Sequence, residues 1–504
     1  MLFTRLLVGI VLCFSLVSCS LAPKYERPQF VMPKEWKNVN PGTAPLNTNW
    51  WVRFRDPALV ALIEEALAKN QDLAKSLANI RSAAAQAGVG SSVFFPQVSG
   101  SAEAQGQLAS NRTANTNFDT PTLSQEYSSH QALFTASWEL DFFGKNRNNY
   151  IMLTDVLMNT VLSHEASRLS VAAQTAETYF QLLSADMRCD ISKRTLETRK
   201  KGLAIYTSRY EQGDITELDW QRARAAVETA EAQYHQSAID VERAEAALAV
   251  LLGRSPRDII EKSVKRGRGL MQLPAPPVLP AGLPSDLLLR RPDIRAAEFL
   301  IMASNANIGV ARAQFFPTIS LTGMTGSMSS SVNKLFSGPA GTWSYGIQGS
   351  IPILDWGRNW YALKDAEARK DVSIAAYRKA VQSAFSDIRA ALASQRETER
   401  VVKSFERQVS SLRRAVEIAS LQYDNGYTDY LTVLDAEREL FSAELSYAQA
   451  LQNRLNAVVG VCQALGGGWE DKGARPSFPI IDTNELITKE TGQKLPGSTE
   501  KKTR

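Results

Sequence analysis

The side chains that most often carry catalysis or bind metals are few in this chain and lie far apart. The three histidines are His130, His164 and His235, and none has a second ligand at the spacing of a zinc site. His164 precedes Glu165 but lacks the second histidine of a zinc-binding helix motif. The sequence has no nucleophile elbow, phosphate-binding loop or CxxC pair, and the glycines at 466–468 are typical of a helix end. We therefore expect no catalytic residues, no metal site and no enzymatic activity.

Cys19 is the residue whose surroundings predict a specific covalent chemistry. Met1–Arg5 is short and basic, Leu6–Phe14 is apolar, and Leu16–Cys19 reads LVSC, similar to the lipobox of bacterial lipoproteins. The pattern predicts a cleaved signal peptide and an N-acyl and diacylglycerol lipid on Cys19, with no other cofactor. Serine rather than aspartate at the next position is typical of lipoproteins sent to the outer membrane. The alternative is an ordinary signal peptide with an incidental cysteine.

The overall composition excludes two further classes of protein. The 504 residues include 57 basic and 52 acidic side chains, and no basic stripe with interleaved aromatic residues occurs. We therefore expect no nucleic-acid partner. Beyond residue 20 no run of about 18 apolar residues exists, which excludes a membrane-spanning helix from the mature chain.

Two similar stretches mark the places where the chain turns back on itself. Tyr423–Asp435 (YDNGYTDYLTVLD) and Tyr210–Arg222 (YEQGDITELDWQR) lie 213 residues apart and share tyrosine, glycine and leucine positions. Gly213 and Gly426 suit the left-handed residue that ends a helix, and the residue three positions later in each copy suits the start of the next helix. One such turn would indicate an ordinary helical hairpin, whereas two at a fixed offset indicate a duplicated architecture.

Each half of the chain also contains two segments in which apolar and polar residues alternate. Such alternation predicts strands with one apolar and one polar face. The four strands would form two hairpins: Gln97–Leu108 with 131–141, and a strand that starts near Phe315 with 343–353.

Long segments without proline follow each predicted hairpin. The segments 145–212 and 358–425 would each be about 100 Å long as continuous helices. The other helical segments are about half that length or shorter. They could complete two further columns by stacking end to end: 216–252 and 429–465 with 57–88 and 292–314.

These features divide the chain into six parts, two of which are repeats. Each repeat would contain a helix, a β-hairpin and a long helical hairpin. The parts are a signal peptide (1–18), a lipidated extended segment (19–56), the first repeat (57–254), a proline-rich link (255–291), the second repeat (292–468) and a flexible C-terminal tail (469–504).

Four strands are too few for a closed membrane barrel, because single-chain barrels begin at about eight strands. Open strand edges in lipid leave backbone groups unpaired. Either the sheet packs on a soluble core, or several chains share one barrel. Three chains would supply twelve strands and twelve helical columns, with the polar strand faces around a water-filled lumen. The fold class expected on this basis is a mixed α+β membrane protein.

Several motifs carry a resemblance to a known family. They are the lipobox LVSC followed by LAPKYERP, the paired FFP strand starts, GLPSDLLLRRPDIRAAE at 282–298, and YDNGYTDYLTVLD. With these motifs the chain resembles the trimeric outer-membrane channels of the TolC family, in the lipoprotein (NodT-type) branch that serves multidrug efflux pumps. The resemblance covers essentially the whole chain up to Gly468.

The resemblance implies a twelve-stranded outer-membrane barrel on a twelve-helix periplasmic barrel, closed at its lower end by inward-coiled helices. By position, Leu431 and Asp435 match the channel gate, and Asp219 with Tyr423 matches a tether between the inner and outer hairpins. Three leucines on a threefold axis would form a dewetting plug, and three carboxylates would select cations. The simpler alternatives are helix packing for Leu431, a solvated acid at Asp435 and a purely structural role for the tether pair.

The resemblance also implies the partners of the protein. They are a homotrimer, a periplasmic adaptor protein that docks at the hairpin tips near Gly213 and Gly426, an inner-membrane RND-type transporter, and outer-membrane lipid. The protein would be a passive exit duct for drugs or other small molecules, anchored in the bacterial outer membrane and extending into the periplasm. Two alternatives are the conduit of a type I protein secretion system and a non-conducting coiled-coil lipoprotein scaffold.

Overall fold

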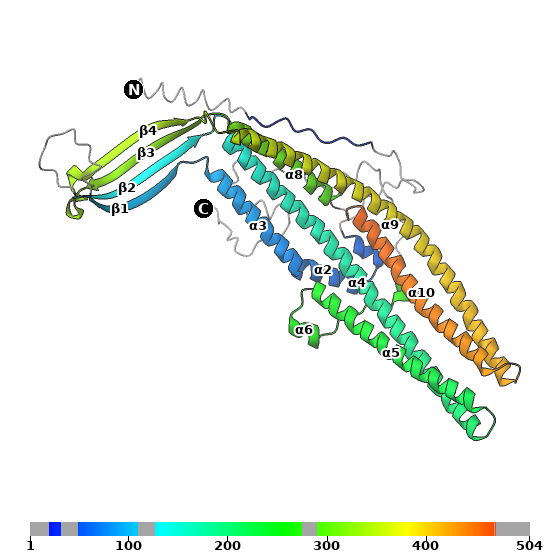
Figure 1. The fold of residues 1–504 in the computed structure, drawn as a ribbon. Coiled ribbons are helices and arrows are strands. Elements are labelled where there is room, and N and C mark those ends of the chain that lie inside the picture. Colours follow the sequence, from blue (N-terminus) through cyan, green and yellow to red (C-terminus); the bar gives the residue numbers. More distant parts are fainter. Residues whose placement is uncertain (1–19, 32–48, 109–125, 275–289, 468, 470–504) are drawn as a thin grey trace, which may run out of the picture.

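A computed structural model of the protein describes residues 20–31, 49–108, 126–274, 290–467 and 469. Within these ranges the chain is elongated, with a β-sheet at one end and two helical hairpins at the other (Figure 1). The predicted signal peptide and the lipidation site Cys19 lie outside the described residues. No helix in the described ranges is both long and apolar enough to cross a membrane.

The helices follow the predicted order closely. The bounds are η1 Trp50–Phe54, α2 Pro57–Lys69, α3 Gln71–Ser92, α4 Lys145–Glu211, α5 Glu217–Leu251, α6 Pro256–Glu261, η2 Leu270–Gln272, α8 Pro292–Ala313, η4 Val332–Lys334, η5 Gly338–Ala340, α9 Arg358–Asp424 and α10 Tyr430–Ala464. The two long segments predicted to be continuous helices are confirmed as α4 and α9, each of 67 residues.

An aspartate lies between the sheet and the first residue of each long helix: Asp141 before Lys145 of α4, and Asp355 before Arg358 of α9. The Asp141 carboxylate accepts hydrogen bonds from the Asn146 and Arg147 amides of α4, at 3.1 and 2.7 Å. In the second repeat, the Asp355 carboxylate accepts from the Gly357 and Asn359 amides, both at 3.0 Å. These carboxylates satisfy amides that have no partner within the helix, so both sheet-to-helix junctions are built in the same way.

The shorter helices stack end to end, as the sequence predicted, and complete two further columns (Figure 1). At the first junction, the Asn70 side-chain amide donates a hydrogen bond of 2.9 Å to the Leu251 carbonyl at the end of α5. At the second junction, Arg291 donates a hydrogen bond of 3.3 Å to the Ala464 carbonyl at the end of α10. The chain therefore forms a wall of four columns, in which α4 packs against α5, α8 and α10, and α9 packs against α8 and α10.

The four strands form one antiparallel sheet in the order β1-β2-β3-β4. Their bounds are β1 Gln97–Leu108, β2 Glu126–Leu140, β3 Thr318–Ser329 and β4 Gly341–Ser350. β2 pairs with β3, for example Leu133 with Gly326, so the two repeats share one sheet. The prediction that the fourth strand reaches residue 353 is wrong, because β4 ends at Ser350 and Pro352 has no amide to donate to a strand ladder.

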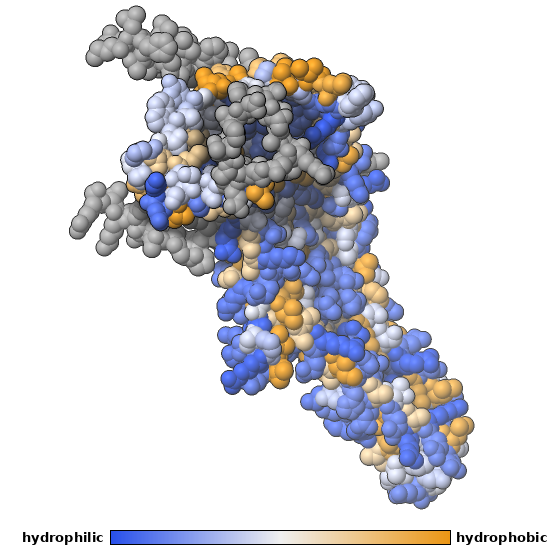
Figure 2. Space-filling model, turned by 60° about the vertical axis from the view of Figure 1, so that its left-hand side comes forward, coloured by the Kyte–Doolittle hydropathy of each residue, from blue (hydrophilic) through white to orange (hydrophobic). Residues whose placement is uncertain are grey.

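One face of the sheet leaves large apolar side chains uncovered. Along β4, Trp343, Tyr345 and Ile347 are more than 70% exposed, and the first two rings stack at 5.8 Å between centroids. Figure 2 shows apolar residues gathered at the sheet end, whereas the helical body is mostly hydrophilic on the face in view. An exposed apolar area of this kind marks a surface that contacts lipid or another protein.

Candidate functional site at the helical tips

Both tip turns have the backbone geometry that the sequence predicted. Gly213 and Gly426 have φ angles of 80° and 75°, in the left-handed region where glycine carries no Cβ penalty. After the turns, Thr216 caps α5 by accepting from the Asp219 amide at 3.2 Å. Asp429 caps α10 by accepting from the Thr432 amide at 3.1 Å. The tips are therefore short, closed turns, with a capped helix on the far side of each.

The predicted gate residues lie on an open face at the beginning of α10. The Leu431 side chain is 40% exposed. The Asp435 side chain is 51% exposed, and its carboxylate pairs with Arg438 of the next helical turn at 3.2 Å. Residues four apart share a helix face, so Leu431 and Asp435 point the same way. Val433, in contrast, is buried against the rest of the chain. Within one chain the gate pair is thus available to contact another copy or the lumen.

Tyr423 packs between the two hairpins in an aromatic cluster with Tyr206 of α4 and Tyr430 of α10. The ring centroids are 4.3 Å apart for Tyr206 and Tyr430, 5.6 Å for Tyr423 and Tyr430, and 5.9 Å for Tyr206 and Tyr423. The Arg209 guanidinium lies 6.0 Å from the Tyr423 ring centre and also pairs with Asp424 at 3.5 Å. We call these three tyrosines, with the apolar residues packed around them, the tip cluster.

Asp219, the predicted partner of Tyr423, bonds within its own hairpin. Its carboxylate accepts from the Thr216 hydroxyl at 2.9 Å and lies 3.6 Å from the Arg222 guanidinium. No hydrogen bond joins Asp219 to Tyr423 in the described part of the chain, although its charge acts on the phenol. Burial raises the pKa of Tyr423, Arg209 opposes that rise, and Asp219 adds to it. The tether pair stays a prediction.

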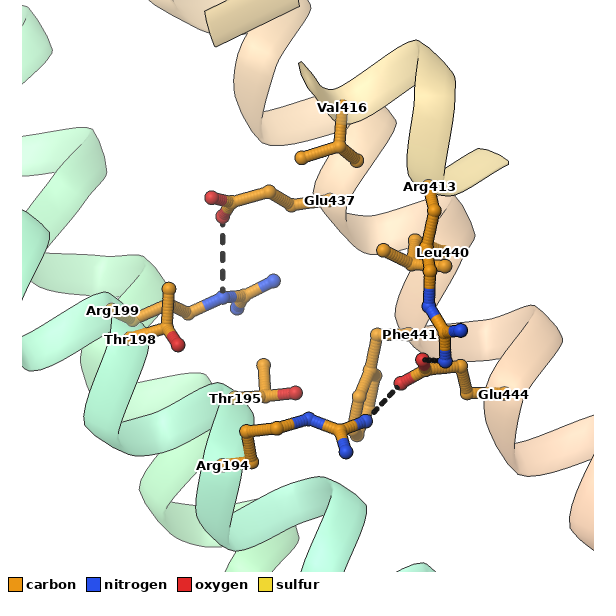
Figure 3. A pocket seen from close by; sticks show the side chains of 10 residues that line it. All are labelled: Arg194, Thr195, Thr198, Arg199, Arg413, Val416, Glu437, Leu440, Phe441 and Glu444. Carbon is orange, nitrogen blue, oxygen red and sulfur yellow. Dashed lines mark hydrogen bonds and ion pairs between the residues drawn. The ribbon is translucent and has the colours of Figure 1, made fainter. Parts of the chain in front are cut away.

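Sequence reasoning missed a group of charged residues that crosses from one hairpin to the other. The Glu444 carboxylate of α10 accepts hydrogen bonds of 2.7 Å from the guanidinium groups of Arg194 on α4 and Arg413 on α9 (Figure 3). The Arg199 guanidinium of α4 lies 3.9 Å from the Glu437 carboxylate. Burial raises the pKa of Glu437, and Arg199 opposes the rise. On sequence alone these residues look like solvated charges, and no local pattern indicates that they meet.

Two motifs that the sequence showed separately form a single contact near the start of α8, close to the junction of α8 with α10. The Tyr25 hydroxyl of LAPKYERP donates to Glu298 of the link motif at 2.9 Å. The Arg27 guanidinium donates two hydrogen bonds, of 2.6 and 2.8 Å, to the same carboxylate. Arg295 pairs with it from one turn earlier on α8. The Glu298 side chain is only 1% exposed, so the N-terminal segment is fixed to α8 by a buried, shared charge.

The described residues contain no candidate metal site, and one buried histidine joins two helices. No group of three histidine, cysteine, aspartate or glutamate side chains there could hold a metal ion. His164 is buried, and its Nδ1 lies 2.7 Å from the Ser76 hydroxyl. Burial, together with the nearby Arg168 charge, lowers the pKa of His164 to about 4. This histidine is therefore a neutral residue that joins α3 to α4.

The sequence and the fold match one family throughout. The model of the outer membrane efflux protein family matches residues 62–254 and 283–467. The toluene efflux pump outer membrane protein TtgI of Pseudomonas putida is 34% identical over 461 residues, covering 90% of this chain and 96% of that protein. OprJ of Pseudomonas aeruginosa is 34% identical over 477 residues, covering 92% and 96%.

Solved structures of outer membrane channels have the same fold. The CmeC channel of Campylobacter jejuni superimposes with a TM-score of 0.85 at 28% identity, covering 94% of this chain and 98% of that chain. The open state of the MtrE channel of Neisseria gonorrhoeae gives a TM-score of 0.77 at 31% identity, covering 89% and 98%.

Proposed function

Because this chain belongs to the outer membrane efflux protein family, we propose that three copies of it form the exit duct of a tripartite efflux pump. The protein is an outer membrane channel component of an efflux system, and it is a channel and not an enzyme. The observation that carries the proposal is the four-stranded sheet with an exposed apolar face, continued by a wall of four helical columns.

The trimer follows from the edges that one chain leaves open. Among the described strands, β1 and β4 each have one edge without a partner strand, which a membrane interior does not tolerate. Three sheets joined edge to edge give twelve strands without free edges, with Trp343, Tyr345 and Ile347 facing lipid. The helical walls, joined in the same way, continue the lumen into the periplasm.

The tips are the end at which the partners would dock. A periplasmic adaptor protein would bind at the turns of Gly213 and Gly426 and move the hairpins apart. An inner-membrane RND-type transporter would supply the work of transport. Relatives of this chain include outer membrane proteins of a solvent and a toluene efflux pump, which favours small-molecule export over protein secretion and over a non-conducting scaffold.

The gate assignment predicts a conductance change. The double variant Leu431→Ser and Asp435→Ala removes the apolar plug and the carboxylate ring, so single-channel conductance in planar bilayers should rise several-fold over a small wild-type value. A large wild-type conductance that the variant leaves unchanged would move the gate elsewhere. No conductance from folded, inserted protein of either kind would overturn the duct.

The lipid on Cys19 is supported by the position of the residue next to it. The Ser20 hydroxyl donates to the Asn148 side chain at 2.9 Å, one turn into α4 and close to the sheet. A lipid on Cys19 would thus start beside the sheet-to-helix junction, at the depth of the inner leaflet. Intact mass measurement should show an N-acyl and diacylglycerol adduct on a chain that starts at Cys19, absent from Cys19→Ser. An unmodified mature N-terminus in the native protein would contradict this.

A further inference from the structure

The contact between the α4–α5 hairpin and the α9–α10 hairpin, which we call the seam, is made by different kinds of side chain at different levels. At the tips, α4 meets α9 and α10 through the tip cluster of Tyr206, Tyr423 and Tyr430. Farther up, α4 and α10 share the largest apolar core, which includes Leu183 and Leu451. Between these two apolar regions the helices form an open cavity of about 350 Å³. The apolar core and the tip cluster are separate buried clusters on either side of it.

Half of the ten residues that line the cavity are charged, and Thr195, Thr198, Val416, Leu440 and Phe441 make up the rest. Its lining includes three arginines and two glutamates, from all three helices (Figure 3): Arg194, Arg199, Arg413, Glu437 and Glu444. α4 runs toward the tips and α10 runs away from them. The Arg194–Glu444 pair therefore lies above the Arg199–Glu437 pair, and the two glutamates are seven residues apart on one face of α10.

Glu444 is the residue on which this arrangement depends. Its side chain is 9% exposed, whereas Arg194 and Arg413 are each 60% exposed. A nearly buried carboxylate must keep a partner, because removing the partner leaves an uncompensated charge. Glu444 has two, and they come from different hairpins. Arg413 is on α9 and belongs to the same hairpin as Glu444, while Arg194 is on α4 and belongs to the other.

We propose that Arg194, Arg413 and Glu444 form an ion-pair clasp that holds the two hairpins together above the tips and sets their closed angle. This inference rests on the proposed opening of the tips. When the α9–α10 hairpin moves away from α4, Glu444 loses Arg194 and keeps Arg413. The carboxylate is never left without a positive partner, so the clasp opens and recloses at low cost. Arg194 pairs with Glu444 only in the closed state, whereas Arg413 pairs with it in both states.

The cavity reduces direct packing at this level of the seam and leaves a larger share of the contact to the charged pairs. Its open volume lies between α4 and α10, so facing side chains there lose some of their dispersion contacts. The Arg199–Glu437 pair, at 3.9 Å and without a hydrogen bond between the two groups, adds a weaker contact on the tip side. The segment below the clasp can thus pivot without breaking the apolar core above it.

The test compares Arg194→Ala with wild type in planar bilayers. We expect open probability to rise roughly two- to fivefold, the range for loss of a partly exposed ion pair. Arg194→Lys keeps the charge that pairs with Glu444 and should restore wild-type behaviour. Lys200→Ala is the matched control, because Lys200 pairs at 2.9 Å with Glu231 inside the α4–α5 hairpin and does not cross the seam. Arg194→Gln provides a second variant if the alanine protein does not form trimers.

The outcomes separate the clasp from the channel itself. The double variant Leu431→Ser and Asp435→Ala could raise conductance while Arg194→Ala and Arg194→Gln behave like Lys200→Ala. That result would contradict the ion-pair clasp and support the channel function. If folded wild type and every variant conduct nothing, the proposed function fails. A rise in open probability for both Arg194 variants, reversed by lysine and absent from Lys200→Ala, supports the clasp. A general loss of stability would instead lower the melting temperature of the trimer, and Arg194→Lys would not restore wild-type open probability.

Discussion

Replacing Glu298 by alanine should release the N-terminal segment 20–31 from α8. The variant removes the carboxylate that Tyr25, Arg27 and Arg295 share. Removing one partner of a fully buried ion pair costs about 3–5 kcal/mol. Because Arg27 is 40% exposed, we expect about 2–3 kcal/mol here. Hydrogen exchange at the amides of 20–31 should then be faster by roughly 30- to 150-fold.

A control for this experiment is a surface carboxylate with a similar bond length. Asp365 pairs with Arg369 at 2.7 Å, but both side chains are more than half exposed. Asp365→Ala should therefore cost about 0.5 kcal/mol or less and leave the exchange of 20–31 unchanged. Equal exchange of this segment in both variants would show that the buried charge does not hold it. Glu298→Gln, which keeps hydrogen-bond acceptance without the charge, should fall between them.

The helices of this fold were predictable because their signals are local. A capping side chain such as Thr216 or Asp429 bonds an amide only three residues away, and a left-handed glycine ends the helix at its own position. The absence of proline from the long segments is likewise visible in the sequence itself. The strand pattern was local too, and it failed where a different local rule applied. Ile351 and Ile353 continue the apolar alternation, but Pro352 between them cannot pair in a ladder.

The contacts between elements could not be read from the sequence in the same way. Nothing near Tyr25 indicates that it meets Glu298, and nothing near Arg194 indicates Glu444. Each of these contacts depends on how whole helices lie against one another, which no periodicity encodes. A resemblance to a family supplied the pair Asp219 and Tyr423, which stays a prediction, whereas the contacts of Tyr423 with Tyr206 and Arg209 appeared only in the structure. The chemistry of the seam therefore emerged only with the structure.

Alanine at Gly466 should be among the most damaging single changes in the helical body. Gly466 ends α10 with a φ of 85°, and a Cβ there would overlap the backbone carbonyl of Arg290 at the junction with α8. Left-handed backbone alone costs about 1–2 kcal/mol for a residue with a Cβ. The overlap adds to that cost, because neither helix end can move without breaking the stacked column. We expect a total loss of at least about 3 kcal/mol, seen as a lower melting temperature of the purified trimer.

The duplication supplies matched controls for the change at Gly466. Gly253 occupies the equivalent junction, with a φ of 66° and the Lys69 carbonyl in the way of a Cβ, so Gly253→Ala should be as harmful as Gly466→Ala. Gly213 and Gly426 are equally left-handed at the tips, but nothing lies within 4 Å of a Cβ there. Their alanine variants should lose only the backbone cost of about 1–2 kcal/mol. Four variants with the same melting temperature would show that backbone conformation alone, rather than the close approach of stacked helices, makes glycine necessary at the junctions.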